Sequence, residues 1–190
     1  MYFGEMELSE NEKLKRIEMS KRFQDSFFFV LTLISVFAEF DRLTMEEAIS
    51  RFKSAYMSII IDYVSVDDYI KKHIDEFCEQ VSQTTIDHLE DDYYLSEERA
   101  IFMAQNETND CTNYDQYSKA IKSGAKTKTW HSIIDKKTRK SHVKMNGKTI
   151  PIDNLFVVGN NALMRFPCDT EYASDNPEEI IGCRCSCSYN

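Results

Sequence analysis

Three cysteines stand at single-residue spacing near residue 190. The segment IIGCRCSCSYN, residues 180–190, places Cys183, Cys185 and Cys187 at alternate positions. Alternate side chains of a strand share one face, so this spacing predicts a strand that presents its thiols together. Such thiols could bind zinc, pack as small apolar groups, or form disulfides or redox pairs. The spacing leaves these alternatives open, because paired cysteines in structural zinc sites more often have two to four residues between them.

Two further residues could complete a metal site with the terminal cysteines. His142 follows the first strand expected in this half of the chain, and Cys168 precedes a polar loop. Zinc is held by four ligands of the imidazole and thiolate kind. The candidate zinc ligands are therefore His142, Cys168, Cys183 and Cys185. Disulfides are the weaker alternative, because MYFGEMELSENEKLKR at residues 1–16 lacks the features of a secretory signal and a reducing cytosol is expected.

A second group of residues could support acid–base chemistry. Asp135 and Arg139 stand four residues apart, where a carboxylate and a guanidinium can pair, and His142 follows. The functional alternative is a metal-independent ribonuclease or phosphotransfer site with His131 or His142 as general acid or base beside Arg139. The sequence offers no second strongly placed catalytic partner, and no phosphate loop, HExxH or GxSxG motif. We therefore expect no catalytic residues.

Charge is strongly segregated along the chain. The formal net charge is −9, and residues 119–148 contain nine Lys and one Arg against one acid, Asp135. This segment therefore carries +9, which leaves −18 for the rest. An acidic chain is not an obvious nucleic-acid binder, but a cationic strip can contact phosphates or an acidic protein surface. The candidate contact residues are Lys126, Lys128, Lys136, Lys137, Arg139 and Lys140.

The elements that must position these residues change in character near residue 126. Apolar residues at helical spacing predict helices over residues 8–40, 44–62, 66–91 and 96–122. The expected N-caps are Thr44, Ser65 and Ser96, and Gly124 ends the last helix. The apolar run FFFVLTLISVFAEF from Phe27 is shorter than the roughly 20 residues that span a bilayer, so it predicts a buried helix.

After Gly124, short runs rich in β-branched and aromatic residues predict strands. We expect strands in TKTWHSII, NLFVVG, ALMRFP and IIGCRCSCSY, a turn and short helix in DKKTRKSH, and a hairpin in VKMNGKTIPI. The pair Asn146–Gly147 suits a type I′ turn in that hairpin.

The fold class is therefore α+β. A helical segment of three to four helices precedes a small mixed α/β domain with a short antiparallel sheet. We expect a docking or oligomerisation segment over residues 1–94 and a second domain over 95–190. That domain has a leading helix over 95–123 and the small sheet over 127–190.

An ordered set of residues runs through this second domain. It comprises Trp130, Asp135, Thr138, Arg139, His142, Gly147, Pro151, Phe156, Pro167, Asp169, Cys183 and Cys185. Together with Glu107 and Asn109 in the leading helix, this set resembles the C-terminal domain of the phage Mu protein F-like head morphogenesis proteins, also called minor head or minor capsid proteins. The resemblance covers roughly residues 95–189, and the order and spacing of the motifs make it specific.

The resemblance implies a phage or prophage virion protein that acts in capsid assembly, near the portal vertex, and that has no turnover. It implies contact with the portal or the major capsid protein, and with heads being filled with DNA. The protein would be an oligomer within the head, made in the bacterial host cytoplasm and without a membrane partner. The alternatives are a toxin-like small nuclease and a DNA-binding accessory factor.

Two departures from the family pattern concern metal binding. Many members have CxxC where this chain has Arg139 and His142, and many have His-Pro-Asn before CRC where this chain has Ile181–Gly182. Cysteines at the first pair suit zinc, whereas here only His142 keeps ligand chemistry. Cys168 stands where relatives of the Arg/His type usually have Gly. The resemblance thus keeps zinc as a candidate cofactor without requiring it.

Overall fold

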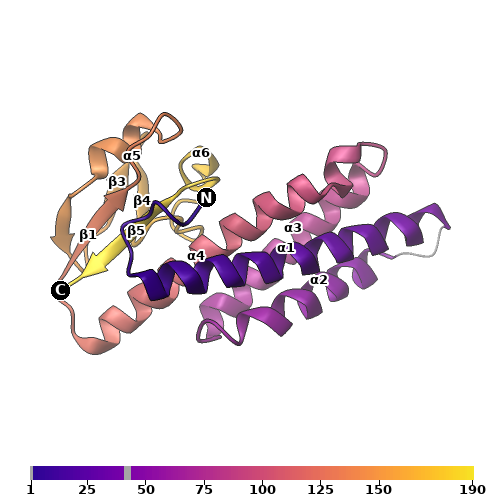
Figure 1. The fold of residues 1–190 in the computed structure, drawn as a ribbon, viewed down its shortest axis with the longest axis horizontal. Helices are drawn as coiled ribbons and strands as arrows, with labels where there is room; N and C mark the ends of the chain where they lie inside the picture. The colour runs from indigo at the N-terminus through magenta and orange to yellow at the C-terminus, as the bar shows by residue number, and fades with distance from the viewer. Residues whose placement is uncertain (1, 41–43) are drawn as a thin grey trace. The chain divides into compact units, whose positions relative to one another are not determined.

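The structure is a computed structural model that describes residues 2–40 and 44–190. It confirms the α+β class, with long helices in the first part of the chain and short antiparallel strands in the second (Figure 1). Contacts divide the chain into a sheet unit, Met1–Ile17 with Asn106–Asn190, and a helical unit, Glu18–Gln105. This division differs from the boundary expected between residues 94 and 95, because the first 17 residues group with the sheet.

Four α-helices and one 3-10 helix precede the strands in the described residues. They are α1 (Glu10–Glu39), α2 (Met45–Ile60), α3 (Asp68–Asp87), η1 (Asp92–Leu95) and α4 (Glu97–Ser123). The helices α1 and α4 each contribute residues to both units. Although α1 is long, none of the helices in the described part of the chain is apolar enough over a sufficient length to cross a membrane.

Local capping explains where these helices begin. Thr44 forms a complete capping box before α2, and Ser96 Oγ accepts a backbone N–H of α4, as expected. The expected cap at Ser65 is wrong, because Asp67 accepts the N–H of Ile70 and α3 begins after it. A carboxylate caps a helix as well as a hydroxyl, and its charge also favours the helix N-terminus.

The helical unit has an aromatic core. The rings of Phe23 and Phe27 on α1 stack with centroids 5.0 Å apart. Phe27 also meets Phe52 and Tyr56 of α2 at 6.1 and 5.7 Å, and Phe77 of α3 at 5.5 Å. Each buried ring contributes on the order of 2–3 kcal/mol through the apolar area removed from water.

One side of α1 remains apolar and exposed. Phe27 and Ile34 are buried, whereas Phe29, Val36 and Phe40 are exposed, Phe29 by 62%. The positions seven and eleven residues after Phe29 return to the same side of a helix. The expected buried helix therefore forms with only one face in the core.

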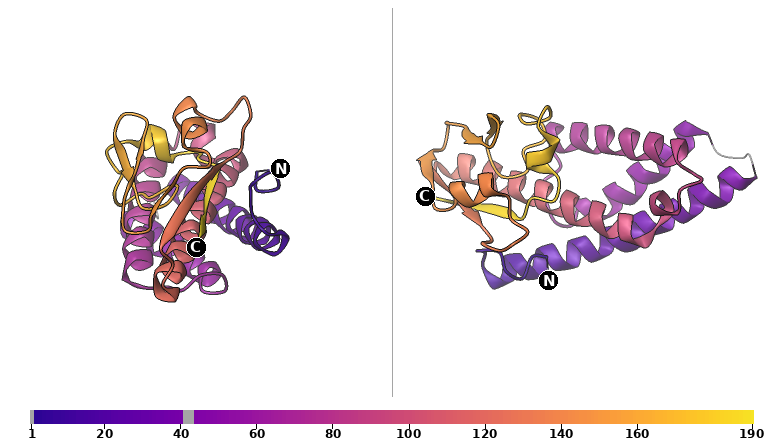
Figure 2. Two further views of the ribbon diagram at one scale, coloured as in Figure 1. Left: turned by 90° about the vertical axis from the view of Figure 1, so that its left-hand side faces the viewer. Right: turned by 90° about the horizontal axis from the view of Figure 1, so that it is seen from above.

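The sheet unit consists of short strands and two short helices. They are β1 (Thr127–Ser132), α5 (Lys140–Met145), β2 (Thr149–Pro151), β3 (Phe156–Val158), β4 (Ala162–Met164), α6 (Pro177–Ile180) and β5 (Cys185–Tyr189). The strand β1 pairs antiparallel with β2 on one side and with β5 on the other, and β3 and β4 form a separate hairpin. Figure 2 shows the yellow strand β5 beside β1, where Trp130 lies opposite Cys187 and Ser132 opposite Cys185.

The hairpin expected at Asn146–Gly147 is wrong. The residues before it are helical, as α5, and β2 pairs with β1 instead. Asn146 has φ −54° and ψ 126°, and Gly147 has φ +76°. These angles define a type II turn, because a type I′ turn requires positive φ at both central residues. The turn carries the chain from α5 into β2 and so fixes the position of α5 against the sheet.

Candidate functional site

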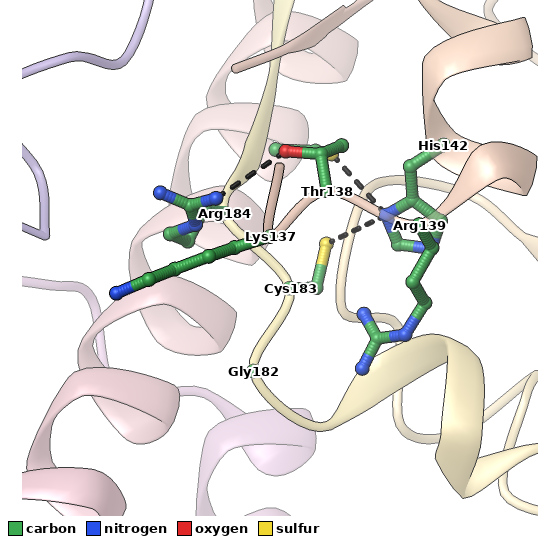
Figure 3. A pocket seen from close by; sticks show the side chains of 8 residues that line it. Lys137, Thr138, Arg139, His142, Gly182, Cys183 and Arg184 are labelled. Carbon is green, nitrogen blue, oxygen red and sulfur yellow. Dashed lines mark hydrogen bonds between the residues drawn. The ribbon is translucent and has the colours of Figure 1, made fainter. Parts of the chain in front are cut away.

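Three potential metal ligands converge in the sheet unit. His142 on α5, Cys183 before β5 and Cys185 at the start of β5 place their ligand atoms within 4.8 Å of one another. His142 Nδ1 lies 3.3 Å from Cys185 Sγ and 3.5 Å from Cys183 Sγ. Figure 3 shows the two contacts as dashed lines that meet at the imidazole. All three side chains are buried, and His142 exposes only 1% of its surface.

A turn, rather than strand alternation, brings the two thiols together. Gly182 has φ +70°, a conformation that glycine adopts without strain, and it leads the chain from α6 into the loop that holds Cys183. Cys183 therefore lies outside the strand, and only Cys185 and Cys187 are on one face of β5 as expected. Cys187 packs into the apolar core and does not join the cluster.

A carboxylate faces the other nitrogen of the imidazole. Glu179 Oε2 lies 3.0 Å from His142 Nε2, and Ser141 Oγ donates a hydrogen bond of 2.7 Å to the same oxygen. The distance suits a hydrogen bond but the direction does not, since Nε2 has no well-directed partner among the described residues. Trp130 packs edge-on against the imidazole, with centroids 5.7 Å apart.

Gly159, in the turn between β3 and β4, makes room for this carboxylate. A Cβ at this position would lie 1.8 Å from Glu179 Oε1. Gly159 also has φ +51°, which side chains rarely adopt. Both observations favour glycine here, and the present position of Glu179 uses the space that glycine leaves.

Cys168 lies next to the three ligands. Its thiol donates to the carbonyl of Cys183 at 3.6 Å and accepts from Asn109 Nδ2 at 3.3 Å. It is buried, with 3% exposure, and has φ +70°. A residue other than glycine in this region is strained by about 1–3 kcal/mol.

The thiols of the cluster are not activated nucleophiles. Burial raises the pKa of Cys183 well above its usual value, and a hydrogen bond with Cys168 adds to the rise. The pKa of Cys185 is also raised, first by a hydrogen bond with Cys183 and then by burial. Both thiols are therefore protonated at neutral pH when no metal is bound, and protonated thiols react slowly.

Two asparagines of α4 hold the backbone on which these cysteines stand. Asn109 Nδ2 donates to the carbonyls of Cys183 and Cys185 at 2.9 and 3.3 Å, and Asn113 Nδ2 donates to that of Cys185 at 3.1 Å. Arg16, fully buried, donates to the side-chain oxygens of both asparagines. Asn109, which the family resemblance includes with Glu107, therefore acts with Asn113 as a polar clamp on the cysteine loop.

Arg184, between Cys183 and Cys185, binds the turn before α5. Its Nη2 lies 2.6 Å from Asp135 Oδ1 and 3.3 Å from Thr138 Oγ1. The hydrogen bond from Arg184 is the largest reason that the pKa of Asp135 lies well below its ordinary range. The pairing of Asp135 with Arg139 considered from their spacing is replaced by this contact, and Arg139 donates instead to the carbonyl of Ile181.

The other residues of the family set build the core around the cluster. Phe156 meets the ring of Trp130 edge-on at 5.1 Å. Asp169, fully buried, accepts three hydrogen bonds of 2.8 Å from the backbone and guanidinium of Arg165. The carbonyl of Pro167 accepts from Asn113. These contacts position the loop that contains Cys168.

The candidate cationic residues separate into exposed and buried groups. The exposed ones are Lys126, Lys136, Lys137 and Lys140, and Arg139 is half-buried. Lys128 is fully buried, with its Nζ donating to the carbonyl of Arg165 at 2.7 Å and lying 5.1 Å from the centre of the Tyr117 ring. Burial lowers the pKa of Lys128 to about 8. The prediction that Lys128 contacts a partner at the surface is therefore wrong, because Lys128 lies in the core of the sheet unit.

The two histidines of the enzymatic alternative lie in different environments. His131 on β1 has Nδ1 2.9 Å from Glu7 and Nε2 2.8 Å from Ser188. His142 is enclosed by thiols, an indole ring and a carboxylate. A general acid or base must come within hydrogen-bond reach of its substrate, and His142 has no such access.

Sequence reasoning missed Glu179, Gly159 and Arg16. Glu179 is one acid among several in a polar loop, and no local pattern distinguishes it from the others. Arg16 lies in a helix rich in charged residues, where burial is not expected.

Comparison with known protein families matches residues 72–188 to the family described as Phage Mu protein F like protein. No curated protein and no solved structure matches the chain. The family match covers more than half of the chain and includes all four candidate metal ligands. The residues that resembled the family in the second domain therefore identify the chain as a member of the Phage Mu protein F like family of phage head proteins.

Proposed function

We propose that the chain is a minor head protein that acts in head morphogenesis at the portal vertex, as a structural component without turnover. The family match over residues 72–188 carries this proposal. The enclosed cluster supports the structural role, because a catalytic site must admit its substrate and His142 is 1% exposed. The protein would accordingly be found in the virion, after assembly in the host cytoplasm.

The helical unit offers a surface that suits a protein partner. We name the exposed residues Phe29, Val36 and Phe40 the α1 face. A groove of about 450 Å³ lies beside it, between α1 and α2, and Ser50 and Ser54 line its α2 side. Small side chains there leave space for a partner's side chain, and exposed apolar faces of this kind mark protein contacts. We assign the α1 face to contact with the portal.

The exposed cations of the sheet unit supply a second surface. Lys136, Lys137 and Lys140 lie in and just after the turn that precedes α5. Such a surface attracts acidic protein surfaces and nucleic-acid phosphates. Packaged DNA or an acidic part of the head would therefore be its partner.

Quantitative mass spectrometry of gradient-purified heads from induced lysates tests the head assignment. We expect the chain in the particles, at far fewer copies than the major capsid protein, because portal vertices are few. Absence from both empty and filled heads would contradict the proposal. It would favour the DNA-binding accessory factor or the toxin-like nuclease, and growth arrest relieved by His131→Ala would single out the nuclease.

Photo-crosslinking from the α1 face identifies the partner. A photoreactive residue in place of Phe29 or Phe40 should capture the portal in assembled heads. The matched control is the same residue at Gln80, which is exposed on α3. Capture of the major capsid protein from Phe29 would mean that the α1 face contacts that protein instead of the portal. Equal capture from Gln80 would mean that the α1 face is not a specific contact surface.

Removal of the cations tests the second surface. The triple variant Lys136→Ser, Lys137→Ser, Lys140→Ser should weaken incorporation into heads or DNA retention. The control, Lys71→Ser with Lys72→Ser, removes exposed charge from α3. Particles that are unchanged in composition and DNA content would exclude these lysines from the mechanism.

A further inference from the structure

Three side chains of the sheet unit, His142, Cys183 and Cys185, bring potential ligand atoms within 4.8 Å of one another, and the Cys168 thiol lies against the Cys183 carbonyl at 3.6 Å. We propose that His142, through Nδ1, and the thiolates of Cys168, Cys183 and Cys185 bind one zinc ion that fastens α5 and the loops before α6 and β5 together. Zinc binding of this kind stabilises a fold and requires no access for substrate. It is independent of any role in head assembly.

The two distances from the imidazole nitrogen to the thiols of Cys183 and Cys185 already fit a tetrahedral ion. With Zn–N of about 2.0 Å and Zn–S of about 2.3 Å, an imidazole nitrogen and a thiolate on one zinc lie roughly 3.5 Å apart. His142 Nδ1 lies 3.3 Å from Cys185 Sγ and 3.5 Å from Cys183 Sγ. The three atoms therefore need little movement to close on an ion.

The space among these side chains suits an ion and nothing larger. A cavity of about 10 Å³ is lined by His142, Cys183 and Cys185, together with Thr138 and Arg139 (Figure 3). This volume is about that of one water-sized sphere, so an organic cofactor or a nucleotide does not fit. Thiolate and imidazole ligands favour zinc over the hard cations Mg²⁺ and Ca²⁺.

The surroundings of His142 are those of a metal-binding histidine. Such histidines commonly donate their second ring N–H to a carboxylate, which fixes the tautomer and the ring orientation. Glu179 Oε2 lies 3.0 Å from Nε2, and Gly159 leaves the space that Glu179 occupies. With the proton on Nε2, the lone pair of Nδ1 points to Cys183 and Cys185. Glu179 is thus a positioning residue for the site.

Cys168 is the fourth ligand. Its φ of +70° would suit glycine, and a strained residue persists where its side chain has a use that offsets the strain. Its thiol lies against the backbone of Cys183 and is held by Asn109. Coordination of zinc by three thiolates and one imidazole releases three protons to solvent and leaves one net negative charge on the site.

Metal content of the full chain is the first test. The chain, purified with a thiol reductant and equilibrated with zinc, should contain about one zinc per molecule by atomic mass spectrometry. Cys183→Ser should lose most of it. The matched control is Cys187→Ala, which removes a buried thiol of β5 that lies outside the cluster and should retain the zinc. Wild-type protein without zinc, or equal loss in Cys187→Ala, would overturn the proposal.

Cobalt substitution gives a second reading of the same site. Cobalt-loaded wild-type protein should show the intense visible bands of tetrahedral coordination with thiolate charge transfer. Glu179→Gln should keep this spectrum while lowering zinc affinity by about 10- to 100-fold, as expected for a carboxylate behind the ligand. An octahedral cobalt spectrum in the wild type would contradict the ligand set.

The variant Cys168→Gly tests whether Cys168 is a zinc ligand or only lies near the site. Without metal, glycine relieves the positive-φ strain, so the variant should melt at or above the wild-type temperature. In excess zinc the order should reverse, because the wild type binds the ion more tightly and gains more from it. A variant that melts higher than wild type in both conditions would exclude Cys168 from the ligand set.

Discussion

The contacts that stabilise the interior of the helical unit differ in kind from those that stabilise the interior of the sheet unit. The rings of Phe23, Phe27 and Tyr56 fill the helical unit with apolar area. The sheet unit buries many polar and ionisable groups, namely Arg16, Asn109, Asn113, Lys128, His142, Asp169 and Glu179. The sheet unit also has an apolar core around Trp130, Phe156 and Met164, but its long loops are fixed by directed polar contacts. Long helices can rely on packing, whereas a small sheet with long loops depends on specific hydrogen bonds and on the proposed zinc site.

The largest effect on this comparison should come from an aromatic deletion. Phe27→Ala should lower the free energy of unfolding of the helical unit by about 3–5 kcal/mol, because it leaves a cavity among Phe23, Phe52 and Tyr56. Chemical denaturation followed by circular dichroism measures the loss. The control Phe29→Ala, at an exposed position on the same helix, should stay within about 0.5 kcal/mol of wild type. Similar losses in both variants would contradict the aromatic core.

A somewhat smaller loss should follow when the polar clamp is removed. Asn109→Ala deprives the carbonyls of Cys183 and Cys185 of a donor and leaves Arg16 without one of its acceptors. Buried groups left without partners cost about 1–3 kcal/mol each, so a loss of about 2–4 kcal/mol is expected. Thermal unfolding monitored by the fluorescence of Trp130, which lies in the sheet unit, measures it. A loss below about 0.5 kcal/mol would show that the clamp is not needed.

The smallest effect concerns pH and Lys128. Its folded pKa is about 8, whereas an unfolded lysine titrates near about 10.4. Between these values the unfolded chain binds a proton that the folded chain does not, so this group makes stability rise with pH across that window. The unfolding free energy of wild type minus that of Lys128→Met should therefore increase from pH 7.5 to pH 10. Denaturant titrations at each pH measure the difference, and a constant value would mean that Lys128 is not desolvated.

The sequence predicted what depends on local pattern. Helical periodicity and the caps at Thr44 and Ser96 were confirmed, as were the strands around Phe156 and Leu163, because each rests on neighbouring residues. The failures came where two local signals competed. Asn146–Gly147 does mark a turn, but the residues before it are helical and the turn is type II.

The cluster itself could be predicted only in part. Cys183, Cys185 and His142 were named as ligands from their chemistry, and the structure brings them within 4.8 Å. Glu179 and Gly159 could not be predicted. Their roles depend on the contact between Glu179 of α6 and Gly159 of the β3–β4 turn, and on the proximity of Glu179 to His142, and no spacing in the sequence indicates these contacts. Lys128 was named as a contact residue because it lies in the cationic segment 119–148. Its partner, the Arg165 carbonyl, is distant in sequence, so no local pattern indicates that Lys128 belongs to the core.

Hydrogen exchange measured by mass spectrometry, with zinc and after chelation, tests the contrast between the units most directly. Removal of zinc should speed exchange in α5 and β5, which carry proposed ligands, and in β1, which pairs with β5. Amides in the centres of α2 and α3 should exchange at the same rate in both conditions, because aromatic packing protects them. Equal responses in the two units, or none in the sheet unit, would contradict the account.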